Sequence, residues 1–234
     1  MNIGVLSDIH GNSVALEAVL KEVKDAGITQ LFVLGDFVGY YYHPDDVLHL
    51  LKDFNTTMVR GNHETLLEKV MRDPQKLEDL QTKFGSSFKL ALERLSKEQL
   101  EMLLSLPERR EVEMAGMKFL LCHGSPARNN EYIYPDADEA KLRECALPGF
   151  DMVLMGHTHY PFAQKVGETT LLNPGSVGQP RDSGGGACWA VIDTASKSAT
   201  LRRTPFDAQR VADEAHSIDP SIPYLSEVQL RKRS

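Results

Sequence analysis

The 234-residue chain has few of the features that mark several common classes of protein. Its three cysteines, Cys122, Cys145 and Cys188, are widely spaced and odd in number, so no disulfide framework is expected. No apolar run approaches the roughly 20 residues needed to cross a bilayer, and the first residues enter a strand pattern without a signal peptide. We therefore expect a cytoplasmic protein with no membrane partner.

Positive charge is also scarce. Lysine and arginine number 26 against 33 aspartates and glutamates, the formal net charge is −7, and no long basic run interrupts the chain. A protein that binds duplex nucleic acid through its phosphates has the opposite balance of charge. Duplex nucleic acid is therefore not an expected partner, whereas a small phosphate-bearing substrate is compatible with this composition.

The rest of the composition is that of an ordinary globular protein. Hydrophobic residues make up 41% and charged residues 25% of the chain. The length suits one domain over residues 1–234, with a hydrophobic core of its own. Within it, residues 65–106 have a helical composition and are interpreted as an insertion covering the sheet. Residues 206–234 are interpreted as a C-terminal tail that packs or frays.

Hydrophobic periodicity predicts an alternation of strands and helices. The first part of the chain is predicted to form strands Ile3–Leu6, Leu31–Leu34 and Thr57–Val59, with helices Ser13–Ala26 and Asp45–Lys52 between them. The second half is predicted to form strands Lys118–Cys122, Met152–Met155, Thr169–Leu172, Ala187–Asp193 and Ala199–Arg203, and helix Glu139–Ala146. This order is typical of an α/β protein with a parallel sheet flanked by helices.

Five short polar segments directly follow predicted strands: Asp8-Ile9-His10, Gly35-Asp36, Gly61-Asn62-His63-Glu64, His123, and Gly156-His157-Thr158-His159. In open α/β sheets the loops at the carboxyl ends of the strands build the binding crevice. Neighbouring strands are only about 4.8 Å apart. We therefore expect these side chains to converge although they are far apart in the sequence.

Apart from His63 and Glu64, these segments supply two carboxylates, one amide oxygen and four imidazoles. This ligand set suits two divalent metal ions that share a carboxylate. A centre of that kind lowers the pKa of a bridging water until hydroxide forms near neutral pH, and it favours in-line attack on phosphorus. The pattern therefore predicts a metal-dependent hydrolase of phosphate esters.

The motifs D-x-H, G-D, G-N-H-E, H and G-H-T-H resemble those of the calcineurin-like metallophosphoesterase superfamily. The resemblance implies a four-layer α/β/β/α sandwich with two mixed β-sheets. It also implies two metal sites that share Asp36, the first completed by Asp8, His10 and His159, and the second by Asn62, His123 and His157. Manganese is the first expectation for both ions, although mixed nitrogen and oxygen ligands also accept iron, zinc, cobalt or nickel.

The same resemblance gives roles to two further residues. His63 would lie beside the substrate phosphoryl group, where it stabilises charge or protonates the leaving oxygen. Glu64 is expected to support the site, or to complement the start of a helix, rather than to bind metal.

Within the superfamily the chain is similar to the compact bacterial and archaeal phosphodiesterase-like branch. Gly39-Tyr40-Tyr41 stands where serine/threonine protein phosphatases have an Asp-Arg-Gly stretch. We therefore expect a phosphodiesterase or nucleotide-phosphate hydrolase. The alternatives are a phosphomonoesterase or protein phosphatase, and a metal-binding interaction scaffold without turnover.

Contacts to substrate are predicted less directly. Arg181 and Arg128 lie in loops where a guanidinium would suit a phosphate. Tyr40 and His43, in the stretch that also contains Tyr41 and Tyr42, are candidates for contact with a nucleobase or an aromatic ester. Packing of this loop is the alternative interpretation.

Overall fold

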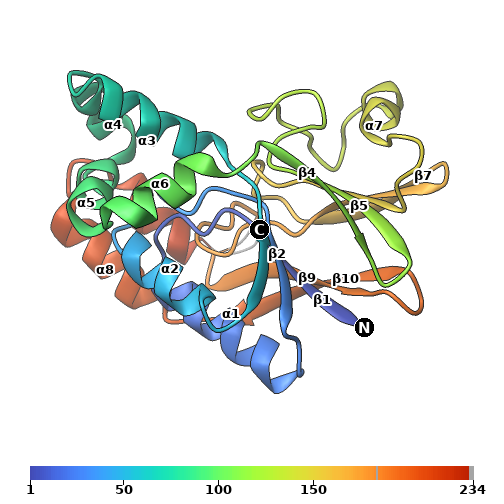
Figure 1. The fold of residues 1–234 in the computed structure, drawn as a ribbon. Helices are drawn as coiled ribbons and strands as arrows, with labels where there is room; N and C mark the ends of the chain where they lie inside the picture. Colours follow the sequence, from blue (N-terminus) through green and yellow to red (C-terminus); the bar gives the residue numbers. More distant parts are fainter. Residues whose placement is uncertain (183, 232–234) are drawn as a thin grey trace.

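The computed structural model describes residues 1–182 and 184–231 (Figure 1). The basic residues Lys232 and Arg233 at the end of the predicted tail lie outside the described residues. Within those ranges, ten strands form two five-stranded sheets that lie against each other.

The first sheet has the strand order β10-β9-β1-β2-β3. Its members are β1 (Asn2–Leu6), β2 (Gln30–Val33), β3 (Asn55–Met58), β9 (Gly186–Asp193) and β10 (Ser198–Pro205). The first three run parallel, whereas β9 and β10 are antiparallel to their neighbours. Each of these strands was predicted, with ends that differ by at most two residues.

The second sheet has the order β4-β5-β6-β8-β7. Its parallel centre consists of β5 (Met117–Cys122), β6 (Met152–Leu154) and β8 (Thr169–Asn173), and its antiparallel edges are β4 (Arg109–Met114) and β7 (Phe162–Val166). The two edge strands were not predicted. Most of their residues are exposed or half-buried, so their sequences lack the apolar signal of a central strand.

Two layers of core and two layers of helices follow from the alternation of side chains along the strands. Ile3, Val5 and Phe32 of the first sheet face the second, and the rings of Phe32 and Phe119 lie 5.4 Å apart. Leu6 and Val33 face the opposite way, toward the helices. Burial on both faces explains why the central strands are almost continuously apolar.

Helices cover the outer faces of both sheets. On the first sheet they include α1 (Ser13–Asp25) and α2 (Pro44–Leu51), and on the second sheet α7 (Glu139–Cys145) (Figure 1). Asn12 caps α1, since its side chain accepts a hydrogen bond from the backbone of Ala15 at 3.0 Å. The predicted α/β/β/α sandwich with two mixed sheets is confirmed.

The predicted helical insertion consists of four short helices on the side of the first sheet: α3 (Asn62–Arg72), α4 (Lys76–Phe84), α5 (Ser87–Arg94) and α6 (Lys97–Ser105). The first begins at residue 62 rather than 65, because the Glu64 carboxylate accepts the backbone N–H of Gly61 at 2.8 Å and completes the first turn. His63 and Glu64 therefore lie on a helix and not in a loop.

The described part of the tail packs against the body of the protein. It forms α8 (Ala208–Ile218), α9 (Tyr224–Glu227) and a 3₁₀ turn at Val228–Leu230. Leu225 is buried with Tyr41 and Tyr42, and the Gln229 side chain donates to the carbonyl oxygen of Gly178 at 2.8 Å. The tail therefore supports the loop that precedes Arg181.

Candidate metal centre and active-site cleft

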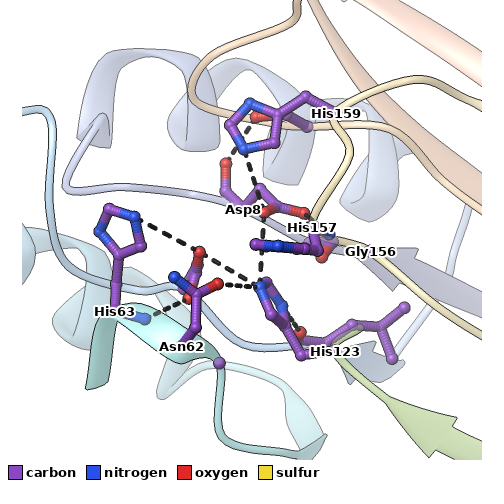
Figure 2. Close-up of polar contacts among 12 residues, drawn as sticks. Asp8, Asn62, His63, His123, Gly156, His157 and His159 are labelled. Carbon is purple, nitrogen blue, oxygen red and sulfur yellow. Dashed lines mark hydrogen bonds and ion pairs between the residues drawn. The ribbon is translucent and has the colours of Figure 1, made fainter. Parts of the chain in front are cut away.

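The predicted ligands converge at the carboxyl ends of parallel strands from both sheets. Asp8, Asp36 and Asn62 follow β1, β2 and β3, while His123 and His157 follow β5 and β6. Figure 2 shows Asp8, Asn62, His123, His157 and His159 around one centre, with His63 beside it. We call the seven residues the ligand cluster: Asp8, His10, Asp36, Asn62, His123, His157 and His159. All are buried except Asn62, which is half-buried.

The backbone around the ligand cluster is held in a strained conformation. The loops after β1 and β2 continue the strand pairing, with the N–H of Asp8 donating to Gly35 at 3.1 Å and that of His10 donating to Asp36 at 2.9 Å. Among the described residues, six of the eight non-glycine residues with positive φ lie here, namely Asp8, His10, Asp36, Tyr40, His157 and His159, at 53–66°. Left-handed conformations cost free energy and concentrate at functional sites.

Each carboxylate has one oxygen fixed by the protein and one directed into the cluster. Asp8 Oδ2 accepts hydrogen bonds from the Ser7 hydroxyl at 2.6 Å and the His157 N–H at 3.0 Å. Asp36 Oδ1 accepts the His63 N–H at 2.8 Å. The second oxygens face imidazoles, with Asp8 Oδ1 3.2 Å from His159 Nε2 and Asp36 Oδ2 3.2 Å from His123 Nε2.

Three imidazoles are oriented by backbone carbonyls. Their Nδ1 atoms lie close to carbonyl oxygens, in His10 at 3.1 Å from Val38, in His123 at 2.7 Å from Leu34 and in His159 at 2.6 Å from Gln179. A carbonyl oxygen can only accept, so each Nδ1 carries a proton and, in a neutral ring, Nε2 presents its lone pair to the cluster. This is how proteins orient histidine ligands of a metal.

The inward atoms fit a cation better than they fit one another. His10 Nε2 and His159 Nε2 are 3.1 Å apart, which brings two lone pairs together when both rings are neutral. Within the described residues, Asp8 Oδ1 and His157 Nε2 are buried without a hydrogen-bond partner. Among the described residues, three groups of possible ligand atoms lie within 4.8 Å of one another. They come from Asp8, His10 and His159, from Asp36, His123 and His157, and from His10, Asp36 and His63. The residues present therefore fit divalent metal.

The charges of the ligand cluster also favour a bound cation. Burial opposes ionisation of Asp36, yet His123 and His63 hold the pKa of its carboxyl well below its usual range. Burial lowers the pKa of His10 well below its ordinary value. For His123 burial acts in the same direction, but Asp36 and Asp8 raise its pKa to about 10. The buried carboxylates thus draw positive charge to the centre.

His63 lies beside the ligand cluster on the first turn of α3. Its ring stacks on Phe88 at 5.6 Å and packs against Tyr40 at 5.0 Å, while Nε2 is 3.9 Å from Asp36 Oδ2. Burial lowers the pKa of His63 to about 4. Gly39, at φ +89°, allows this packing, because a β-carbon there would lie 2.0 Å from His63 Nδ1.

Glu64 supports the loop that carries Asp36. Its carboxylate accepts the N–H groups of Asp36 at 3.0 Å, Phe37 at 2.8 Å and Gly61 at 2.8 Å. Burial and the nearby Asp36 raise its pKa to about 7, and the hydrogen bonds from Gly61 and Asp36 oppose that rise. The side chain has the supporting position expected from the sequence.

A cleft of about 640 Å³ opens over the ligand cluster. Three of the four predicted substrate contacts, Tyr40, Arg128 and Arg181, line it, together with Lys69 and Lys83 from the helical insertion. The Arg181 guanidinium donates to the Tyr40 hydroxyl at 3.1 Å. The Arg128 side chain is 72% exposed and lies 3.7 Å from Glu131.

The fourth predicted contact, His43, is absent from the described lining of the cleft. Its imidazole lies 2.7 Å from the Glu214 carboxylate and 3.7 Å from Asp46. The neighbouring Tyr41 and Tyr42 are buried, and their hydroxyls donate to the tail. His43 therefore joins the tail to the body of the protein, and among the described residues it does not line the cleft over the ligand cluster.

Several supporting residues were not recognised from the sequence. Asn173 donates to the carbonyl oxygen of Gly156 at 2.7 Å, and Ser176 donates to that of Asp8 at 2.7 Å. Both belong to the segment Asn173-Pro174-Gly175-Ser176, whose composition is that of a turn and carries no signal of this supporting role. Tyr132, whose ring centre is 4.0 Å from that of His157, is not part of any of the sequence motifs.

Comparison with known proteins agrees with this geometry. Residues 1–197 match the calcineurin-like phosphoesterase superfamily domain. The chain is 32% identical to the uncharacterized protein MJ0912 of Methanocaldococcus jannaschii, over 91% of this chain and 90% of that protein. It is 24% identical to the phosphodiesterase YfcE of Escherichia coli, over 82% of this chain and 88% of that protein.

The fold has a close counterpart among solved structures. A metallophosphoesterase from Sphaerobacter thermophilus superposes with a TM-score of 0.79 and 28% identity, over 98% of this chain and all of that one. No helix among residues 1–182 and 184–231 has both the length and the apolar character of a membrane span. Motifs, fold and ligand cluster together place the chain in the calcineurin-like phosphoesterase superfamily.

Proposed function

We propose that the protein is a binuclear metal-dependent phosphodiesterase or nucleotide-phosphate hydrolase that acts on small phosphate esters. The observation that carries this proposal is the ligand cluster, in which buried oxygen and nitrogen atoms from two sheets face a common centre. The likeness to YfcE, a phosphodiesterase, favours diesters over monoesters.

In this proposal two metal ions would share Asp36. Asp8, His10 and His159 would hold the first ion, and Asn62, His123 and His157 would hold the second. Asn62 Oδ1 is 2.9 Å from His123 Nε2, so the amide oxygen reaches the same point as the imidazole. When bound to these residues, a pair of divalent ions, with manganese proposed first, would supply Lewis-acid stabilisation of phosphoryl charge and a water of lowered pKa for in-line attack.

The side chains around the cluster bind and orient the ester. His63 lies close enough to contact a phosphoryl oxygen, and the negative charge of a bound phosphate favours its protonated form. The Arg181 guanidinium, positioned by Tyr40, offers paired N–H groups to phosphate oxygens. Phe84 and Phe88 pack against the His63 ring and restrict its movement.

The experiment is a comparison of bis(p-nitrophenyl) phosphate with p-nitrophenyl phosphate, using metal-stripped protein reconstituted with manganese. The proposal expects two bound ions per chain and faster cleavage of the diester. His63→Ala should retain the ions and lose on the order of 100-fold in turnover. His49→Ala, at an exposed position of α2, is the matched control and should match the wild type.

Other outcomes separate the alternatives. Faster cleavage of the monoester would indicate a phosphomonoesterase. Two bound ions with no turnover of either ester would favour the interaction scaffold. Fewer than two ions per chain would contradict the binuclear assignment.

A further inference from the structure

Two exposed tyrosines have no part in the proposed metal chemistry: Tyr132, which meets His157 of the ligand cluster, and Tyr134, which lies beside Tyr132. Tyr132 is 50% exposed and Tyr134 is 39% exposed. Both belong to the loop between β5 and α7, residues 123–138. Contiguous exposed aromatic surface beside a cleft is a common mark of a ligand-binding site.

The geometry of the loop explains why both rings point outward. Ile133 between them is 1% exposed and packs in the core of the second sheet with Leu120 and Leu142. Side chains two apart along an extended segment face the same way, so burial of Ile133 directs Tyr132 and Tyr134 to the same outer side. The two rings lie 5.8 Å apart and are inclined by only 10°.

Further contacts fix the position of the two tyrosines. Glu131 accepts a hydrogen bond from the Ser125 hydroxyl and lies 2.8 Å from the Lys141 ammonium of α7. Tyr134 also meets Tyr160, the residue after the G-H-T-H motif, edge to face at 5.8 Å. The tyrosines are therefore held in place by α7 and by the ligand-bearing loop.

The tyrosine pair is continuous with the proposed metal centre. The Tyr132 ring centre lies 4.0 Å from that of His157, and Tyr132 lines the same cleft as Asp36, Asn62 and His63. A phosphate held at the cluster would therefore place the group attached to it near the open part of the Tyr132 ring. Lys69 and Lys83, from the helical insertion, add positive charge to the lining of this cleft.

We propose that Tyr132 and Tyr134 form a stacking platform for a nucleobase, so that the substrates of this site are nucleoside phosphates. The inference rests on the proposed function, because it requires a phosphate at the ligand cluster. A base is planar and stacks on an aromatic ring, whereas an aliphatic ester has no group that gains from the platform. The role considered from the sequence for the tyrosines after Asp36 is thus transferred to this pair.

The test compares two phosphates that differ only in the base. Dissociation constants of adenosine 5′-monophosphate and ribose 5-phosphate are measured by calorimetry on manganese-loaded His63→Ala protein, which suppresses turnover. Base stacking should make adenosine 5′-monophosphate bind roughly 10-fold more tightly than ribose 5-phosphate. In the same background, Tyr132→Ala should bring the ratio of the two constants close to one, and Tyr132→Phe should preserve it.

Tyr134→Ala keeps the contact with His157 intact and should reduce the ratio by a smaller factor. Manganese content and melting temperature, recorded for each variant, identify any protein that fails to fold or to load. A ratio near one in the parent, or an unchanged ratio in Tyr132→Ala, would overturn the platform while phosphate binding upholds the proposed function. Failure of both phosphates to bind the loaded protein would overturn the proposed function and the platform together.

Discussion

The floor and the rim of the cleft are built on opposite principles. On the floor, the buried side chains of Asp8 and Asp36 each have one oxygen fixed by neighbouring hydrogen-bond donors. On the rim, Arg128 and Tyr132 are largely exposed, and their loop lies outside the sheets. Buried, hydrogen-bonded groups keep their positions, whereas exposed ones can adapt to a ligand. On the proposed function, we therefore expect the buried floor to determine the chemistry and the exposed rim to determine the choice of substrate.

The largest effect is expected where the floor loses a charge. Asp36→Asn removes the carboxylate that is proposed to be shared by two metal ions and that lies 3.2 Å from His123 and 3.8 Å from His10. Loss of metal should reduce hydrolysis of bis(p-nitrophenyl) phosphate on the order of 1,000-fold, with fewer ions per chain by elemental analysis. Asp25→Asn, whose side chain is 66% exposed, is the control. Full metal content with normal turnover would show that the floor does not depend on Asp36.

A smaller effect should follow from moving His63 without removing it. Gly39→Ala places a methyl group 2.0 Å from His63 Nδ1, so the ring must shift. A displacement of about 1 Å costs roughly 100-fold in turnover, and bound metal should be retained. Gly149→Ala has the same φ of +89° but open space around it, so it reports backbone strain alone. Equal losses in the two variants would mean that the position of His63 is unimportant.

On the rim, substitutions should alter KM more than kcat. Arg181→Lys keeps the charge but loses the planar fork that donates to Tyr40. We expect KM to rise roughly 10-fold with kcat largely retained, the pattern of lost ground-state binding. Arg128→Lys, at a 72% exposed side chain, should change KM about twofold or less. A fall in kcat without a change in KM would show that Arg181 acts in the transition state and not in ground-state binding.

The smallest effect is expected behind the rim, where the tail meets the body of the protein. A hydrogen bond to Glu214 raises the pKa of His43 above 6.5, with Asp46 acting in the same direction and Arg94 against it. The same hydrogen bond lowers the pKa of Glu214 below 4.5. The stabilisation from His43 is complete below pH 6.5 and is lost as the pH rises through its folded pKa. That from Glu214 is complete above pH 4.5 and is lost as the pH falls through its folded pKa.

The free energy of unfolding of Glu214→Gln, measured by denaturant titration, should therefore lie below that of the wild type by about 0.5–1 kcal/mol between pH 4.5 and 6.5. The difference should shrink on both sides of that window. Glu227→Gln, elsewhere in the tail, is the control. A difference that does not vary with pH would show that the loss comes from packing and not from the ion pair.

The difference between buried and exposed parts of the molecule also explains which features could be predicted from the sequence. Buried central strands such as Ile3–Leu6 have a continuous apolar pattern, and the polar residues after them mark the floor of the cleft. The edge strands β4 and β7 escaped prediction because backbone pairing, and not apolar burial, defines them. The proximity of Tyr132 to His157 depends on the path of a loop, which leaves no periodic signal in the sequence.

His43 is a residue whose position in the structure could not be predicted from the sequence. Its place three residues after Tyr40 suggested a substrate contact, but the chain turns away from the cleft between them. Tyr41 and Tyr42 are drawn into the core formed with the tail, and His43 follows them toward Glu214. That partner lies 171 residues away in sequence, so no local pattern could identify it.

The left-handed backbone of the ligand cluster restricts which amino acids the protein can tolerate there. At Asp8, His10, Asp36, His157 and His159 the main chain has φ values that asparagine, aspartate, histidine and glycine tolerate best. A saturation library at these positions, selected only for folded protein, should therefore return mainly these four amino acids and few valines or isoleucines. Mutational tolerance at the site would then reflect the shape of the main chain even in molecules that no longer bind metal.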